Sequence, residues 1–298
     1  MTWENALHDY QLYLKIERGL SENSIQSYTL DIKKLILFLE DKSLKISPIS
    51  ISSETIQNFI YDKAKILNSR SQSRLISGLR SFFNYLIFEN YREDNPLEHI
   101  ESPKIGRKLP NVLSEQEIDA IINAIDVSKP QGERNRAMLE TLYGCGLRVS
   151  ELINLRISDL FFEEGFIRVS GKGNKQRFVP IIPVTQKYIN IYKDTIRCHI
   201  NIQPGHNDTL FLNRRGKTLT RAMIFTIIKR LARKIDLTKN ISPHTFRHSF
   251  ATHLLENNAD LRSIQLMLGH ESITTTEIYV HLDKSHLISV LEKYHPRK

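Results

Sequence analysis

The ten residues from Glu101 to Pro110 place the strongest limit on the fold, because a compact domain cannot run through them. They read ESPKIGRKLP and combine two prolines, a glycine and three cations with no apolar periodicity. Such a composition is typical of an inter-domain linker. A chain of 298 residues is long enough for a hydrophobic core on each side of it. We therefore expect a first domain over residues 1–100, a linker over residues 101–112 and a second domain over residues 113–298.

Helical spacing of apolar side chains dominates the first domain and predicts a bundle of four helices. The first helix covers Trp3 to Glu17, and the others begin near Ser21, Ser53 and Ser71, because serine is a common helix N-cap. Three arginines on or beside the fourth helix either contact a DNA backbone or line a solvated face: Arg70, Arg74 and Arg80.

The second domain combines helices with a small antiparallel sheet. Ser114 and Glu117 form a capping-box pattern at its start. Strand patterns cover Phe166–Ser170 and Arg177–Ile182, with a further short strand at 210–212. Other helices are expected over about 134–143, 185–200 and 221–235. The predicted fold class is mainly α with a small antiparallel β-sheet, arranged as an N-terminal helical bundle and a C-terminal α+β domain.

A stretch near the C-terminus holds side chains suited to phosphate chemistry. Ser242 is a good N-cap, and His244 and Arg247 follow three residues apart in the first turn of the predicted helix. A second helix ends at Gly269, His270 comes next, and a polar loop leads to Tyr279. A phenol has a pKa of ~10 and needs neighbouring cations to become a nucleophile. This group suits a tyrosine that attacks a phosphodiester without a metal or another cofactor.

Two further cations precede this stretch. Arg148 follows a glycine-rich break in the chain, and Glu151 lies three residues later, where it can orient the guanidinium. Lys172 lies between two glycines in the turn that joins the two predicted strands. Taken singly, each of these side chains is more often structural than functional, and only their combination favours an active site.

Composition indicates a nucleic-acid partner. The net charge is +9 with a pI of about 9.4, which is typical of proteins that bind a polyanion, although a merely basic surface fits almost equally well. The chain has only two cysteines, which argues against a disulfide framework or a cysteine zinc site. The N-terminus lacks a signal-peptide pattern, and no apolar run approaches ~20 residues. We expect a cytoplasmic protein without a membrane partner.

Five motifs together resemble the tyrosine recombinase (phage integrase-like) family. They are GLRVSEL with Arg148, SGKGNKQR with Lys172, HTFRHSFATHL with His244 and Arg247, LGH with His270, and TTTEIYVH with Tyr279. The order and spacing match the family over nearly the whole chain. Within the family the chain is most similar to the bacterial XerC/XerD recombinases, and its tail is nearer to XerD. The resemblance implies an N-terminal domain that clamps DNA and a C-terminal catalytic domain.

The resemblance also implies a role for each candidate residue. Tyr279 attacks a DNA phosphodiester and forms a 3′-phosphotyrosine, and Arg148 and Arg247 grip the phosphate oxygens. Lys172 is the candidate to protonate the departing 5′-oxygen. His244 takes or holds the tyrosine proton, and His270 donates to a phosphate oxygen.

The same resemblance implies partners. These are a double-stranded DNA recombination site and a second recombinase protomer, in a homo- or hetero-tetramer on two sites. The tail over residues 284–298 has helical apolar spacing, and it either packs on its own domain or docks into the neighbouring protomer. The implied biological role is the resolution of chromosome or plasmid dimers at cell division. The sequence leaves open whether a septal DNA translocase controls activity.

Several alternatives remain at this point. An integrase or transposase of a mobile element shares the site, and so do a relaxing topoisomerase and a non-catalytic DNA-binding relative. A zinc hydrolase would use His244 and His248, but Thr245 stands where its glutamate is needed. The helix over 221–235 carries five cations that either contact DNA or form a solvated face.

Overall fold

The computed structural model describes residues 1–297 except 105, 107–110, 172–174 and 270–283. Three predicted site residues, Lys172, His270 and Tyr279, therefore lie outside the described residues. The chain divides into two compact units, Met1–Lys108 and Leu109–Lys298, and each has its own hydrophobic core. No helix in the described ranges is long and apolar enough to span a bilayer.

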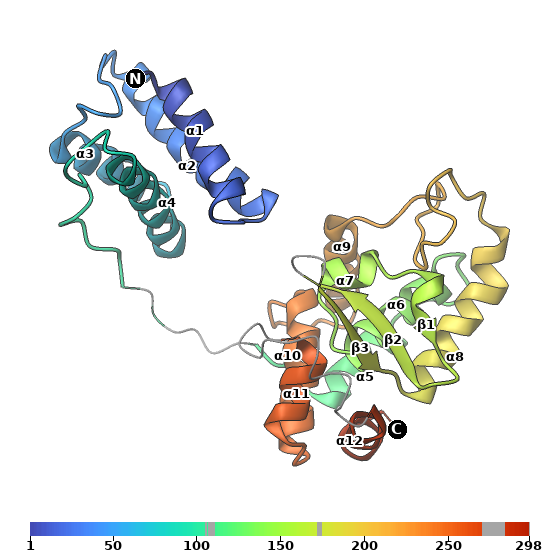
Figure 1. Ribbon diagram of the computed structural model, residues 1–298. Helices are drawn as coiled ribbons and strands as arrows, with labels where there is room; N and C mark the ends of the chain where they lie inside the picture. The colour runs from blue at the N-terminus through green and yellow to red at the C-terminus, as the bar shows by residue number, and fades with distance from the viewer. Residues whose placement is uncertain (105, 107–110, 172–174, 270–283, 298) are drawn as a thin grey trace. The chain divides into compact units, whose positions relative to one another are not determined.

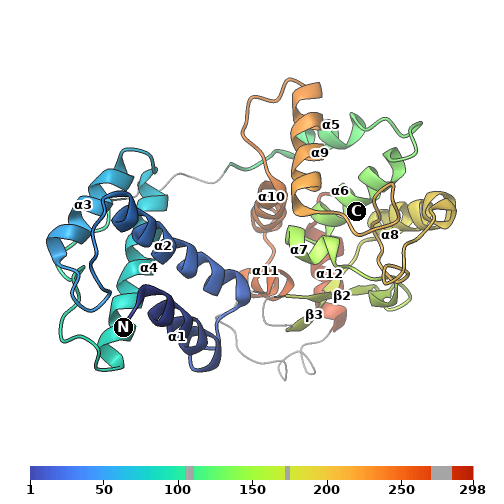
Figure 2. The ribbon, with the colours of Figure 1, turned by 90° about the horizontal axis from the view of Figure 1, so that it is seen from above.

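The described residues of the N-terminal unit form a bundle of four helices (Figure 1). Helix α2 packs against α1 and α4, and α3 packs against α4; Figure 2 shows α1, α2 and α4 alongside one another. Aromatic side chains fill the core, where Tyr10, Phe59 and Phe82 are fully buried. The helices are α1 (Trp3–Ile16), α2 (Glu22–Asp41), α3 (Ser53–Ala64) and α4 (Ser69–Phe88).

Two helix starts in this unit differ from the prediction. Helix α3 is capped by Ser52, whose hydroxyl accepts a hydrogen bond from the backbone N–H of Thr55 at 3.2 Å. Helix α4 is capped by Asn68, whose side chain accepts from the N–H of Ser71 at 2.9 Å. Asparagine is as good an N-cap residue as serine, so α4 begins after Asn68 rather than after Ser71.

Two arginines of α4 have structural partners. The Arg74 guanidinium donates to both carboxylate oxygens of Asp31, which is fully buried on α2. The Arg80 guanidinium donates to the carbonyl oxygen of Ile100 at 2.7 Å. These contacts join α4 to α2 and to the segment around Ile100 that follows the bundle. They indicate that Arg74 and Arg80 stabilise the fold. Arg70 is exposed.

In its described residues the second unit contains an antiparallel sheet of three strands in the order β1-β2-β3. Helix α6 is buried along almost its whole length and packs against α5, α8 and α10. The strands are β1 (Leu160–Phe161), β2 (Phe166–Ser170) and β3 (Gln176–Pro180). The helices are α5 (Glu115–Asn123), α6 (Gly132–Gly144), α7 (Val149–Ile153), α8 (Pro183–Ile191), α9 (Arg221–Lys234), α10 (Pro243–Glu256), α11 (Leu261–Leu268) and α12 (Lys284–Tyr294). The predicted fold class is confirmed.

The differences in this unit are local. Strand β1 was not predicted, because two residues are too short to show an alternating pattern. Residues 210–212 form no strand; Leu212 makes only an isolated bridge with Thr218. The helix expected over 185–200 is not continuous: α8 ends at Ile191, and a short π-helix follows over Tyr192–Ile196.

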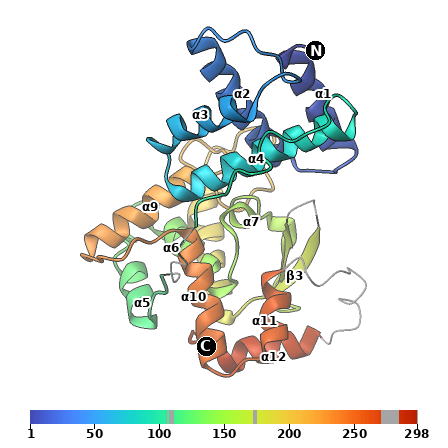
Figure 3. The ribbon, with the colours of Figure 1, turned by 90° about the vertical axis from the view of Figure 1, so that its left-hand side faces the viewer.

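The C-terminal tail packs on its own unit in this structure. Helix α12 contacts α10, α11 and β3, and it lies beside α11 in Figure 3. Its side chains Leu287, Val290 and Leu291 are buried in the core of the unit. Beyond the helix, the Arg297 guanidinium pairs with the carboxylates of Glu140 and Asp119.

Candidate active site

Arg148 lies at the N-cap of α7, directly after a sharp turn from α6. Gly146 makes that turn with a φ of +56°, a conformation that favours glycine. One turn later, Glu151 accepts from the Arg148 backbone N–H at 2.8 Å and from its Nη1 at 2.9 Å. The predicted role of Glu151, orienting the guanidinium, matches this geometry.

Arg247 reaches the same place from α10. The cap of this helix follows the prediction, since Pro243 is its first residue and the Thr245 hydroxyl accepts from the Ser242 N–H at 3.0 Å. The Arg247 Nη1 donates to the carbonyl oxygen of Gly146 at 2.8 Å and lies 3.8 Å from the Glu151 Oε2. The structure thus brings Arg148 and Arg247 together around one carboxylate.

A third arginine, Arg177 of β3, completes this cluster. Its Nη1 and Nη2 donate to the two carboxylate oxygens of Glu151 at 2.7 and 3.0 Å. Arg177 was not predicted as a site residue. A signal was present, because Arg177 alternates with Val179 on the inward face of the strand, while Gln176 is exposed. A charge at an inward strand position requires a partner.

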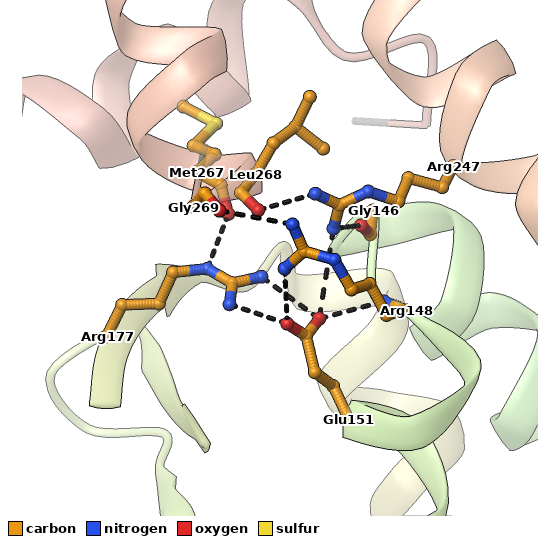
Figure 4. Close-up of polar contacts among 8 residues, drawn as sticks. All are labelled: Gly146, Arg148, Glu151, Arg177, Arg247, Met267, Leu268 and Gly269. Atoms are coloured by element: carbon orange, nitrogen blue, oxygen red, sulfur yellow. Dashed lines mark hydrogen bonds and ion pairs between the residues drawn. The ribbon is translucent and has the colours of Figure 1, made fainter. Parts of the chain in front are cut away.

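The C-terminal end of α11 holds all three guanidinium groups. Three consecutive carbonyl oxygens each accept from a different arginine: Met267 from Arg177, Leu268 from Arg247 and Gly269 from Arg148 (Figure 4). The last carbonyls of a helix lack intrahelical partners and carry the negative end of its dipole. The helix end therefore fixes the arginines without adding a full negative charge.

The cluster is electropositive. It contains three guanidinium groups and one carboxylate, a net charge of +2. Burial, together with repulsion from Arg148, lowers the pKa of Arg247 to about 9. Burial by itself would raise the pKa of Glu151, but the bonds from Arg177 and Arg148 hold this pKa below its ordinary value. Arg247 and Glu151 are therefore both charged at neutral pH, and the cluster of three guanidinium groups and one carboxylate suits an anion such as a phosphate.

The side chains of the cluster differ in their access to solvent. The Arg148 side chain is 35% exposed and that of Arg247 10%, whereas Arg177 is 6% and Glu151 1% exposed. An incoming phosphate can thus reach Arg148 and the edge of Arg247. Arg177 and Glu151 lie behind them.

His244 lies in the first turn of α10, about one turn before Arg247, and it is exposed. Partial burial lowers its pKa, and the nearby His248, Arg247 and Arg148 lower it further. The imidazole is therefore neutral at pH 7 and can accept a proton. The same positive potential disfavours a metal cation between His244 and His248, which argues against the zinc-hydrolase alternative.

Lys172, His270 and Tyr279 lie outside the described residues. The last described residues before Lys172 and before His270 are Gly171 and Gly269, and both lie at the arginine cluster. A side-chain Cβ at Gly171 would lie 3.8 Å from both the Arg177 Nη1 and the Glu151 Oε1. A Cβ at Gly269 would lie 2.9 Å from the Arg177 side chain. The residues that directly precede Lys172 and His270 are therefore neighbours of Arg177.

Comparison with known proteins identifies the family. Residues 111–286 match the Phage integrase family, and residues 7–90 match its N-terminal SAM-like domain. The chain belongs to the phage integrase family of tyrosine recombinases. The resemblance inferred from the five motifs is confirmed.

Relatives in the phage integrase family cover nearly the whole chain. The tyrosine recombinase XerD of Oceanobacillus iheyensis is 42% identical over 297 residues and covers 99% of each chain. The structure of XerH site-specific recombinase bound to its difH substrate, in a pre-cleavage complex, has a TM-score of 0.69 at 25% identity. That likeness covers 89% of this chain and 79% of the other. A post-cleavage XerH complex with palindromic difH has a TM-score of 0.70 at 27% identity and covers 92% and 82%.

Proposed function

We propose that this chain is a XerD-type site-specific recombinase that cuts and rejoins DNA through a phosphotyrosine at Tyr279. The observation that carries the proposal is the pairing of Arg148 and Arg247 around Glu151, which forms an anion site with a net positive charge. Near-complete coverage by relatives named tyrosine recombinase XerD supports the same reaction. We further propose that the biological reaction is the resolution of chromosome or plasmid dimers at cell division.

The chemistry follows from the residue types. The Tyr279 oxygen attacks phosphorus, its proton passes to His244, and the bond from phosphorus to the 5′-oxygen breaks. Lys172 gives a proton to that leaving oxygen. Rejoining reverses these steps with the 5′-hydroxyl of another strand, so the covalent intermediate conserves the bond energy and needs no ATP.

Arg148 and Arg247 bind the non-bridging oxygens, with His270 as a further donor. They stabilise the charge that builds on the phosphate in the transition state. Removing one such group typically costs about 10²–10³ in rate.

Partners follow from the same proposal. The N-terminal unit clamps a double-stranded DNA site, and a second protomer, identical or related, completes a tetramer on two sites. The tail over residues 284–298 exchanges its intramolecular packing for a neighbouring protomer in that assembly. A septal DNA translocase controls the activation of the complex.

A nicked suicide substrate carrying a candidate dimer-resolution site tests the reaction. Wild type and Tyr279→Phe are incubated with it in EDTA and separated under denaturing conditions. We expect a covalent protein–DNA band for wild type only, with equal DNA binding by both proteins in a mobility-shift assay. A covalent band that persists in Tyr279→Phe would disprove the assignment of the nucleophile.

A further inference from the structure

Arg177 is a buried cation that the proposed reaction does not use directly. Its side chain is 6% exposed, and among the described residues it donates hydrogen bonds to the Glu151 carboxylate and to the carbonyl oxygen of Met267. A group in this position cannot bind the phosphate itself. Any effect on the reaction must pass through Glu151 or through the end of α11.

Glu151 has two opposing effects on an anion site. It fixes Arg148 through bonds to both the backbone N–H and the Nη1 of that residue. The same carboxylate also places a negative charge beside Arg148 and Arg247, and that charge repels a phosphate. Orientation and attraction are therefore in conflict unless another cation balances the carboxylate.

We propose that Arg177 is that cation: it neutralises Glu151 from the buried side and leaves the charges of Arg148 and Arg247 available to the DNA phosphate. The bidentate geometry, at 2.7 and 3.0 Å, is the arrangement in which an arginine binds a carboxylate most strongly. With Arg177 the cluster has a net charge of +2, and without it the net charge is +1. Arg177 is thus a positioning residue, and this inference rests on the proposed function.

Arg177 also aligns the anion site mechanically. Its Nε donates to the Met267 carbonyl oxygen at 2.9 Å, which ties β3 to the end of α11. The next two carbonyls of that helix end hold Arg247 and Arg148. The neutralisation of Glu151 and the alignment of the end of α11 therefore both depend on the Arg177 side chain. An experiment must separate these two effects.

Single-turnover cleavage of two suicide substrates separates the two effects. One substrate carries the natural phosphodiester at the scissile position, and the other carries a methylphosphonate, which lacks the negative charge. The proteins are wild type, Arg177→Gln and the double variant Glu151→Gln/Arg177→Gln, whose cluster again has a net charge of +2. DNA affinity and thermal melting are measured for each protein.

Arg177→Gln should slow cleavage of the phosphodiester on the order of tenfold to a hundredfold, the effect of one charge several ångströms away at an effective dielectric constant of about 20. The methylphosphonate rate should fall less, since this group carries one negative charge fewer than the phosphodiester both before attack and in the transition state. The double variant should recover a large part of the phosphodiester rate relative to Arg177→Gln. DNA affinity should change little, because Arg177 lies behind the binding surface.

Arg168→Gln is the matched control. Arg168 lies on the neighbouring strand β2 and pairs with Asp159 at 2.8 Å rather than with Glu151. Its cleavage rates on both substrates should equal those of wild type. Equal losses on both substrates by Arg177→Gln, with no recovery in the double variant, would overturn the charge-balance role and leave only alignment. If wild type itself forms no covalent adduct, the proposed function fails and the inference fails with it.

Discussion

At the scale of single residues, His295 is an unusual feature of the tail. Its ring is fully buried, with its centroid 4.9 Å from that of Tyr143 and 5.6 Å from that of Phe250. Its Nδ1 accepts from the Arg297 N–H, and its Nε2 has no hydrogen-bond partner among the described residues. Burial, with the charge of Arg297, lowers the pKa of His295 to about 3. The neutral imidazole is therefore part of the folded state.

This burial predicts a pH dependence of stability. The unfolded chain binds a proton at His295 below a pKa of ~6.5, whereas the folded chain does not until about pH 3. The contribution of His295 to the free energy of unfolding is fully present above pH 6.5. It is lost as the pH falls from 6.5 towards about 3, by up to about 1.4 kcal/mol per pH unit. Urea unfolding at pH 7.5 and 5.5 should show a loss about 1.4 kcal/mol larger in wild type than in His295→Gln.

His199→Gln is the control for this comparison, because His199 is exposed in the same unit. It should lose as much stability as wild type between the two pH values. An equal loss in wild type and His295→Gln would contradict the neutral, buried state of His295.

At the scale of elements, the turn between α6 and α7 connects packing to the site. Gly146 holds a positive φ, and its carbonyl oxygen accepts from Arg247. A Cβ at this position would lie 2.5 Å from the Phe250 ring. Only glycine lets α6 turn into α7 while α10 packs this closely.

Gly146→Ala should therefore destabilise the second unit and slow cleavage. Left-handed backbone strain and overpacking against Phe250 together cost about 2 kcal/mol or more. The measurement is urea unfolding combined with the suicide-substrate assay.

Gly205→Ala separates the two causes, since Gly205 has a φ of +83° but a Cβ there would meet nothing within 4 Å. This variant should lose only the backbone part, about 1 kcal/mol, and should cleave normally. A Gly146→Ala protein as stable as Gly205→Ala would show that Phe250 moves aside at no cost.

At the scale of the whole molecule, stability resides in two separate cores. The core of the N-terminal unit shares no residue with that of the second unit. The tail contributes Leu287, Val290 and Leu291 to the second core only. Changes in the tail should thus leave the N-terminal unit unaffected.

Deleting residues 284–298 should lower the stability of the second unit by roughly 5 kcal/mol, because three buried aliphatic side chains contribute roughly 1.5–3 kcal/mol each. Calorimetry should show the transition of the second unit shifted down and that of the N-terminal unit unchanged. A synthetic peptide of residues 284–298 should restore part of the loss when added in trans. A truncated protein that melts like wild type would show that the packing of α12 contributes no stability.

Local sequence patterns were sufficient to predict most helices and the family. Helical periodicity and caps such as Ser114 with Glu117 are local, so they predicted most helices to within a few residues. The motifs around Arg148 and Arg247 identified the family because each candidate site residue lies in a recognisable short segment. Errors arose where a local pattern was short or ambiguous, as at β1, the cap of α4 and residues 210–212.

Which side chains share a site, and which are structural, depends on the packing of distant segments. Arg177 and Glu151 are 26 residues apart, and the strand register and the end of α11 make them partners. The structural contacts of Arg74 and the intramolecular packing of α12 depend likewise on which surfaces meet. A buried charge is stable only with a partner at bonding distance, and that distance is a property of the packed chain rather than of any local pattern.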